Sequence, residues 1–275
     1  MNFAKHYTHY LSQRPVLNIC LVITYYLLVV LPHEVIGIWI AETLDKPFGR
    51  DTYNLIILAL GVTGCLGYLY FVWNGARHRP DKGKKTYLYL LATLALIVLS
   101  FNTILVVNVE IIHFIQYALL ALLVFPLFSS YQETLFWSTV LGAIDEGYQY
   151  LVLAPERTNY YDFNDVLIDM VGATLGLILL SAYGVNKAKL LTFYQRSSFR
   201  GFVVITLLVL VALGMGWMTI YPSVDGSMAY FPLIKKVSTE FWTIIHPNVN
   251  FHVVRPLEWL ILTILLWFLY KDIGK

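Results

Sequence analysis

The sequence predicts an all-α integral membrane protein, a polytopic helical bundle of about eight transmembrane helices. Of its 275 residues, 58% are hydrophobic and 13% are charged, whereas a soluble domain usually carries about 25% charged residues. Eight apolar segments approach the length of about 20 residues that a helix needs to cross a bilayer. Because hydrocarbon offers the backbone no hydrogen-bond partners, each of these segments is expected to be a helix.

The expected helices follow one another along the whole chain, and the first, fourth and eighth are short. They cover residues 16–31, 53–73, 86–107, 111–128, 133–153, 165–184, 201–221 and 255–270. Two connections on the same side are long, residues 33–52 and 222–254, and both mix apolar and charged residues with a tryptophan. Each is read either as an amphipathic helix on the membrane surface or as an ordinary loop, and both readings stay open.

The distribution of basic residues predicts the orientation. With eight spans, the side of the membrane that holds both termini carries thirteen Lys and Arg, and the other side carries six. The positive-inside rule therefore places both termini in the cytoplasm and the chain in the inner (plasma) membrane. A net charge of +2 without a basic, aromatic-rich face argues against a nucleic-acid partner. Membrane lipids are the expected partners, and the oligomeric state is left open.

Small residues within the apolar segments are expected to serve packing. Cys20 and Cys65 lack the spacing of metal ligands and are predicted to be buried, inert thiols. Five glycines are predicted to let helices approach one another closely. They are Gly61, Gly64, Gly67, Gly172 and Gly176.

The middle of the chain carries polar residues at membrane depth, where one charged side chain costs about 2.5–3.5 kcal/mol. Such residues must face one another, water or a ligand. Helical spacing sorts them into one stripe on each of the fourth, fifth and sixth spans. The stripes are Glu110, His113 and Tyr117; Gly142, Asp145, Glu146 and Gln149; and Asp165, Asp169, Gly172 and Gly176. Because the fourth and sixth spans run inward and the fifth runs outward, all three stripes are predicted to meet in one polar pocket in the outer half of the membrane.

Each candidate residue has a functional and a structural reading. Burial and neighbouring anions raise a carboxyl pKa toward that of a general acid, so Asp145 and Glu146, with His113, are candidates for acid–base catalysis. The alternative is that protonated or paired carboxyls tie the helices together. The candidates for substrate binding are Arg157, Gln149, Tyr117, Asp165, Asp169 and Glu110.

Two further residues lie in the connection above the predicted pocket. Arg157 is expected either to bind a phosphate or carboxylate group or only to neutralise the acids below it. Asp162 is expected to cap the sixth helix. The acids would suit an oxygen-ligated cation, but no metal motif is present, so the sequence predicts neither a metal nor a cofactor.

These motifs together resemble the VanZ-like family of membrane proteins. The shared patterns are N-x-E-x-x-H-F-x-x-Y, D-E-x-x-Q, and an Arg followed by D-x-x-x-D-x-x-G-A-x-x-G. The resemblance covers about residues 86–184, which are predicted to form a four-span core between two-span extensions at residues 1–85 and 185–275. The family usually has Asn where this chain has Asp169, which changes the charge of the site.

The resemblance implies a role at the cell envelope, because the family is named for a protein that raises resistance to the lipoglycopeptide teicoplanin. The pocket is accordingly predicted to bind an envelope lipid, a lipid-linked precursor or a lipidated glycopeptide-type antibiotic. Three alternatives stay open. They are an intramembrane enzyme that uses its carboxylates as acid and base on a lipid-linked substrate, a proton-coupled transporter and an assembly scaffold. Against transport, the three spans show no ionisable relay toward the inner face.

Overall fold

The computed structural model describes residues 3–105, 110–153, 155–156, 158–185, 196–221, 231–237, 240–246 and 249–274. The α-helices are α1 (Phe3–Ser12), α2 (Pro15–Tyr25), α3 (His33–Phe48), α4 (Arg50–Ala76), α5 (Pro80–Thr103), α6 (Ile111–Phe128), α7 (Tyr131–Tyr148), α8 (Phe163–Ala182), α9 (Ser197–Gly214) and α10 (Pro256–Tyr270). Two π-helical segments, η1 (Tyr26–Val30) and η3 (Gln149–Leu153), extend α2 and α7. The strands are β1 (Met218–Thr219), β2 (Phe231–Pro232), β3 (Thr243–His246) and β4 (Val249–Phe251).

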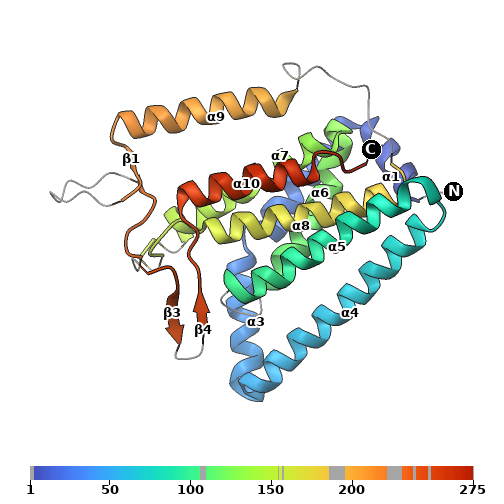
Figure 1. Ribbon diagram of the computed structural model, residues 1–275. Coiled ribbons are helices and arrows are strands. Elements are labelled where there is room, and N and C mark those ends of the chain that lie inside the picture. Colours follow the sequence, from blue (N-terminus) through green and yellow to red (C-terminus); the bar gives the residue numbers. More distant parts are fainter. Residues whose placement is uncertain are drawn as a thin grey trace.

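Helix α8 forms the centre of the bundle (Figure 1), with α4, α5, α6, α7 and α10 in contact with it. Most of α8 is buried, whereas none of α9 is. In Figure 1, α9 runs along one side of the bundle, apart from its core. The sequence explains why α8 is the central helix, because α8 carries small residues on the faces that its neighbours approach.

The structure supports an all-α membrane bundle. Within the described residues, five helices are long and apolar enough to cross a membrane: Asp51–Ala76, Gly83–Thr103, Ile111–Phe128, Phe163–Ala182 and Ser197–Gly214. A sixth span arises if Phe3–Ser12 and Pro15–Val30, bent by 107°, are taken together, and α10 is apolar but shorter. The number of eight spans therefore remains a prediction.

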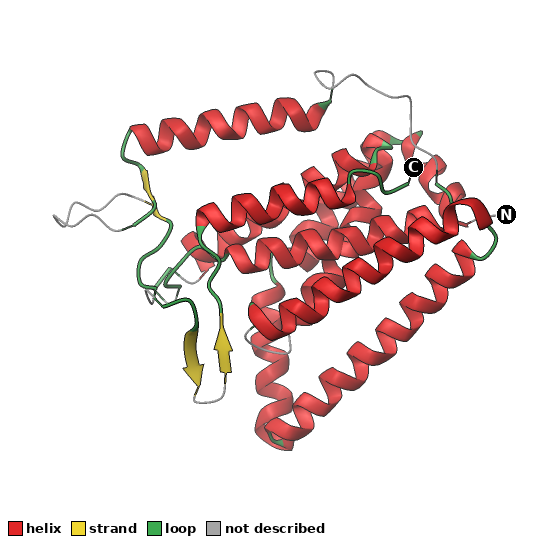
Figure 2. Cartoon of the chain, viewed as in Figure 1, coloured by secondary structure: helices red, strands yellow, loops and turns green. Residues whose placement is uncertain are grey.

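The two long connections differ in structure. Residues 33–48 form α3, which runs across one end of the bundle, so the first connection is helical, and its position on the membrane surface stays a prediction. The helical reading of residues 222–254 is wrong for the part that is described. There β1 pairs in parallel with β2 and β3 pairs antiparallel with β4, and the arrows of β3 and β4 stand out among the helices in Figure 2.

Some of the packing predictions also need correction. Both Cys20 and Cys65 are exposed on the apolar surface, so they are not buried. A side chain at Gly64 or Gly67 would meet nothing within 4 Å, so these two glycines do not serve close packing. At Gly172, by contrast, an added Cβ would lie 3.0 Å or less from the α6 backbone.

Candidate functional site

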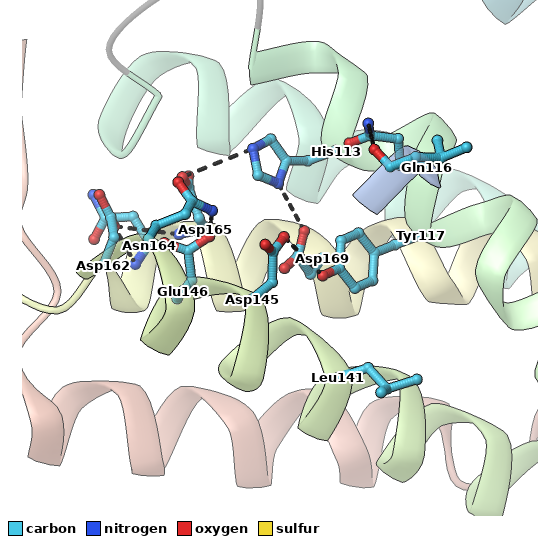
Figure 3. Close-up of polar contacts among 12 residues, drawn as sticks. His113, Gln116, Tyr117, Leu141, Asp145, Glu146, Asp162, Asn164, Asp165 and Asp169 are labelled. Atoms are coloured by element: carbon cyan, nitrogen blue, oxygen red, sulfur yellow. Dashed lines mark hydrogen bonds and ion pairs between the residues drawn. The ribbon is translucent and has the colours of Figure 1, made fainter. Parts of the chain in front are cut away.

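The three predicted polar stripes meet at one end of the bundle, where α6 and α8 begin and α7 ends (Figure 3). Side chains from these helices point toward one another there, and most of them are buried. We call this set the acid centre. It consists of His113, Tyr117, Asp145, Glu146, Gln149, Asp165 and Asp169.

His113 joins two helices at the middle of the acid centre. Its Nδ1 lies 2.8 Å from Oδ1 of Asp169, and its Nε2 lies 3.8 Å from Oδ2 of Asp165. Only 2% of His113 and none of Asp169 is exposed, whereas the Asp165 side chain is 18% exposed. One imidazole therefore faces two carboxylates, and the more exposed carboxylate lies at the edge of the centre.

Two further pairs complete the acid centre. The Tyr117 hydroxyl donates to Oδ2 of Asp145 at 3.3 Å, and the Tyr117 ring is nearly parallel to that of His113. Gln149 in η3 donates from Nε2 to Oε1 of Glu146 at 2.9 Å. These bonds supply donors to carboxylates that burial would otherwise penalise.

Glycines allow the helices to come this close. A Cβ added at Gly142 would lie 2.6 Å from Oδ2 of Asp169, so α7 approaches α8 directly over that carboxylate. At Gly172 and Gly176 an added Cβ would meet the backbone of α6. The predicted small faces thus hold α6 and α7 against α8 and bring the stripes together.

The two π-helical segments both border the acid centre. In η1, Tyr26 donates to the carbonyl of Leu141 at 2.8 Å, and Val29 accepts from the Gln116 amide at 3.2 Å. The η3 segment begins with Gln149, the partner of Glu146. Such segments frequently occur at functional sites. The sequence reasoning missed the contribution of the first span, although its adjacent Tyr25 and Tyr26 are unusual polar residues in an apolar run.

The start of α8 is fixed by two side chains. Asp162 is the N-cap, and its Oδ1 accepts from the backbone N–H groups of Asn164 and Asp165 at 3.0 and 3.3 Å, as predicted. Asn164, which the sequence reasoning missed, donates to the carbonyls of Ile104 and His252 and accepts from the Val254 N–H. The sequence signal that could have identified Asn164 is its amide side chain in the first turn of the predicted sixth helix.

The chain after α9 covers this end of the bundle. We call the described parts of residues 231–254 the C-terminal cap. The Tyr161 N–H donates to the Leu233 carbonyl at 2.8 Å, and the Tyr150 hydroxyl donates to the carbonyl of Pro232. The Lys235 ammonium donates to the Pro155 carbonyl at 2.7 Å. The connection between α7 and α8 is thereby held under the cap.

The electrostatics of the centre are dominated by acids. In the described part of the chain, His113 is the basic group in contact with the carboxylates. Just outside α8, burial raises the pKa of Asp162 well above its usual 3.8, and the carboxylates of Asp165 and Glu110 raise it further, against the backbone N–H groups that lower it. Glu110, at the start of α6, is half-buried. The predicted counter-ion Arg157 lies outside the described residues.

Among the described residues, no group of three or more His, Cys, Asp or Glu side chains is arranged to hold a metal ion. A shallow surface depression lies between η3, the end of α9 and β1–β2. It is lined by Leu151, Ala212, Trp217, Met218 and Phe231. Within the centre, His, Tyr and carboxyl groups lie close enough to exchange protons, whereas the lining of the depression includes no residue of the centre.

Comparison with known proteins supports the resemblance noted from the motifs. The model of the VanZ/LLP1 family matches residues 8–184, a range that contains every residue of the acid centre. The matched range ends before α9, the C-terminal cap and α10. Neither the search of curated proteins nor that of solved structures found a significant match.

Proposed function

Since the chain belongs to the VanZ/LLP1 family, we propose that this membrane protein binds an amphipathic molecule of the cell envelope at its acid centre. The proposal places the centre in the outer half of the inner membrane, with both termini in the cytoplasm. A lipid-linked precursor, an envelope lipid or a lipoglycopeptide such as teicoplanin has the required combination of a polar head and an apolar tail.

The observation that carries the proposal is the convergence of two α8 carboxylates, Asp165 and Asp169, on the imidazole of His113 from α6. An excess of acids favours a ligand that offers ammonium or hydroxyl donors, such as an amine-bearing headgroup or a sugar. Asp165 is the group at the edge of the centre that a headgroup reaches first, because its side chain remains 18% exposed.

An apolar surface depression offers a second contact for an amphipathic ligand. Leu151 of η3, Trp217 and Phe231 line it. Leu151 follows Gln149 of the acid centre by two residues, so the two side chains point to nearly opposite sides of η3. A ligand that uses both surfaces would therefore contact η3 on two sides.

The test is ligand-induced stabilisation of the purified chain in lipid nanodiscs. A ligand at a hundred times its Kd stabilises a protein by about 2.7 kcal/mol, so envelope lipids, a lipid-linked precursor and teicoplanin are compared by thermal unfolding. Asp165→Asn is expected to abolish the stabilisation, whereas Glu42→Gln, an exposed carboxylate on α3, keeps it. Equal stabilisation of both variants, or none of wild type by any compound, contradicts the proposal.

One observation favours acid–base catalysis as a second candidate. The 2.8 Å contact between Nδ1 of His113 and Asp169 orients the imidazole, and a carboxylate in that position stabilises an imidazolium ion when the other nitrogen takes up a proton. An enzyme would lose turnover of a lipid-linked substrate in His113→Gln while still binding it. A binding protein would show no chemical change in the ligand with wild type.

A further inference from the structure

The first helix of the chain turns sharply away from the helix that follows it. The axes of α1 and of the segment Pro15–Val30 differ by 107°. Pro15 is the first residue of α2, and proline has no backbone N–H with which to continue the hydrogen bonds of α1. Because α2 and η1 pack against α6 within the bundle, α1 lies across the bundle rather than along it.

The helix α1 lies at the end of the bundle away from the acid centre. At the other end of α2, the Tyr25 hydroxyl donates to the carbonyl of Gln116, next to the centre. Pro15 precedes Tyr25 by ten residues, which is about 15 Å along the axis of α2. The start of α2, and α1 with it, therefore lie toward the end of the bundle where Figure 1 also shows the C-terminus.

One face of α1 packs on the bundle. Helical spacing places Ala4, Thr8 and Leu11 on this face. Thr8 and Leu11 are buried, and Ala4 packs against the hydrophobic core. The helices that α1 contacts are α2 and α6. The protein thus fixes one side of α1, and the remaining faces are left for its surroundings.

A second face of α1 is aromatic. Phe3, Tyr7 and Tyr10 follow one another at intervals of four and three residues, and Phe3 and Tyr10 are 80% and 44% exposed. The rings of Phe3 and Tyr7 stack with their centroids 6.3 Å apart. The guanidinium of Arg14 lies 3.8 Å from the centroid of the Tyr10 ring. Aromatic side chains are enriched where a membrane meets water, and this face is suited to that position.

The third face of α1 is polar and basic. Lys5, His6 and His9 are exposed on it, and the exposed Arg14 follows directly after the helix. The first 33 residues contain no Asp or Glu, so no carboxylate in this part of the chain offsets the positive charge. Charged side chains are costly at the centre of a bilayer. The basic face therefore favours the membrane surface over the hydrocarbon as the position of α1.

We propose that α1 is an interfacial helix that binds anionic phospholipid headgroups at the end of the bundle away from the acid centre. Phe3, Tyr7 and Tyr10 insert at the boundary between headgroups and acyl chains, and Lys5 and Arg14 contact the lipid phosphates. Burial of the aromatic rings and attraction between opposite charges both contribute to binding. The positive charge selects anionic lipids over zwitterionic ones.

This lipid-binding surface is separate from the acid centre and shares no residue with it. Loss of the lipid contact would leave the proposed binding of an envelope molecule at the acid centre untouched. Equally, a failure of that proposed function would not affect the lipid contact of α1.

The test identifies the lipids that touch α1 in the full-length chain. Cys20→Ala and Cys65→Ala remove the native thiols, and Phe3→Cys on the aromatic face carries a fluorophore. The chain is placed in vesicles of equal parts phosphatidylcholine and phosphatidylglycerol, with bromine on the acyl chains of one lipid or the other. Bromine quenches the fluorophore only on contact. A fluorophore at His9→Cys on the basic face is the matched control for depth.

Brominated lipid is expected to quench the fluorophore at residue 3 and to quench the one at residue 9 only weakly. The quenching is expected to show at least about fivefold preference for phosphatidylglycerol, since one Lys or Arg near an anionic surface accounts for about that factor in affinity. Lys5→Gln combined with Arg14→Gln should bring the preference close to one. Lys46→Gln, which removes an exposed lysine of α3, should leave it unchanged.

Three results would overturn the proposal. Absence of quenching at residue 3 by either lipid would mean that α1 does not touch the bilayer. Equal quenching by the two lipids would mean that α1 does not select anionic headgroups. Equal quenching at residues 3 and 9 would place α1 within the hydrocarbon. If the double variant does not fold, added salt replaces it, because salt screens surface charges and should abolish the preference of the unsubstituted helix; a preference that persists in salt would also contradict the proposal.

Discussion

Replacement of Gly142 by alanine tests the close approach of α7 to α8 at the acid centre. The added Cβ would lie 2.6 Å from Oδ2 of Asp169, 3.1 Å from its Cβ and 3.3 Å from its Cγ. A flexible side chain could turn away, but Asp169 is fully buried and is held by His113. The methyl group therefore forces either the helices apart or the carboxylate off the imidazole.

The magnitude follows from three contributions. Overpacking of a buried site costs about 1–3 kcal/mol, and loss of a hydrogen bond to a charged group costs about 1.5–3 kcal/mol. Alanine regains about 1 kcal/mol of helix propensity relative to glycine. We therefore expect Gly142→Ala to lower the free energy of unfolding by about 2–5 kcal/mol.

The assay is reversible unfolding of the detergent-solubilised chain, followed by circular dichroism. Gly64→Ala on α4 is the matched control, since a Cβ there meets nothing within 4 Å, and it is expected to be neutral or slightly stabilising. Combining Gly142→Ala with Asp169→Ala removes the obstructing carboxylate. The double variant is therefore expected to lose less unfolding free energy than the two single variants lose in total. If Gly142→Ala behaves like Gly64→Ala, the described packing of Asp169 against α7 is incorrect.

Three further predictions concern neighbouring contacts. His113→Leu leaves Asp169 buried without its cationic partner and is expected to cost about 3–5 kcal/mol in the same unfolding assay; a loss below about 1 kcal/mol would mean that the pair is not ionised. Asn164→Leu removes the amide that joins α8 to the C-terminal cap, so limited proteolysis within the cap should accelerate while the helix content stays constant. The folded state raises the pKa of Asp162, so folding favours the protonated carboxyl. The contribution of Asp162 to stability is therefore fully present below the usual carboxyl pKa and is lost as pH rises through the raised pKa. Asp162→Asn, which keeps the N-cap, should therefore flatten the pH dependence of stability, and an unchanged pH profile would argue against the shift.

The sequence predicted the acid centre well because its evidence is local and periodic. Spacings of three, four and seven residues placed His113 with Tyr117 and Asp165 with Asp169 on common faces, and the alternation of the spans brought these faces to one depth. The cost of charge in a membrane then left no arrangement other than convergence. The N-cap role of Asp162 followed from the same local rules.

Long-range contacts lay beyond that reasoning. The cap of residues 231–254 mixes apolar and charged residues much as a surface helix does, and only pairing with distant backbone shows that it is extended instead. The contacts of Tyr26 with Leu141 and of Asn164 with His252 join segments about 90 to 115 residues apart. Exposure of the two cysteines was missed because apolar surroundings in a membrane include lipid as well as protein core.

The π-helical turn at the end of α7 constrains how related chains can be compared. A π turn accommodates about one residue more than an α turn, so η3 rotates the residues that follow Gln149 relative to α7. A relative without the surplus residue would present the side chains after this position about 100° around the axis from where they point here. An alignment across residues 149–153 must therefore admit a single-residue gap, or it will equate positions that face opposite environments.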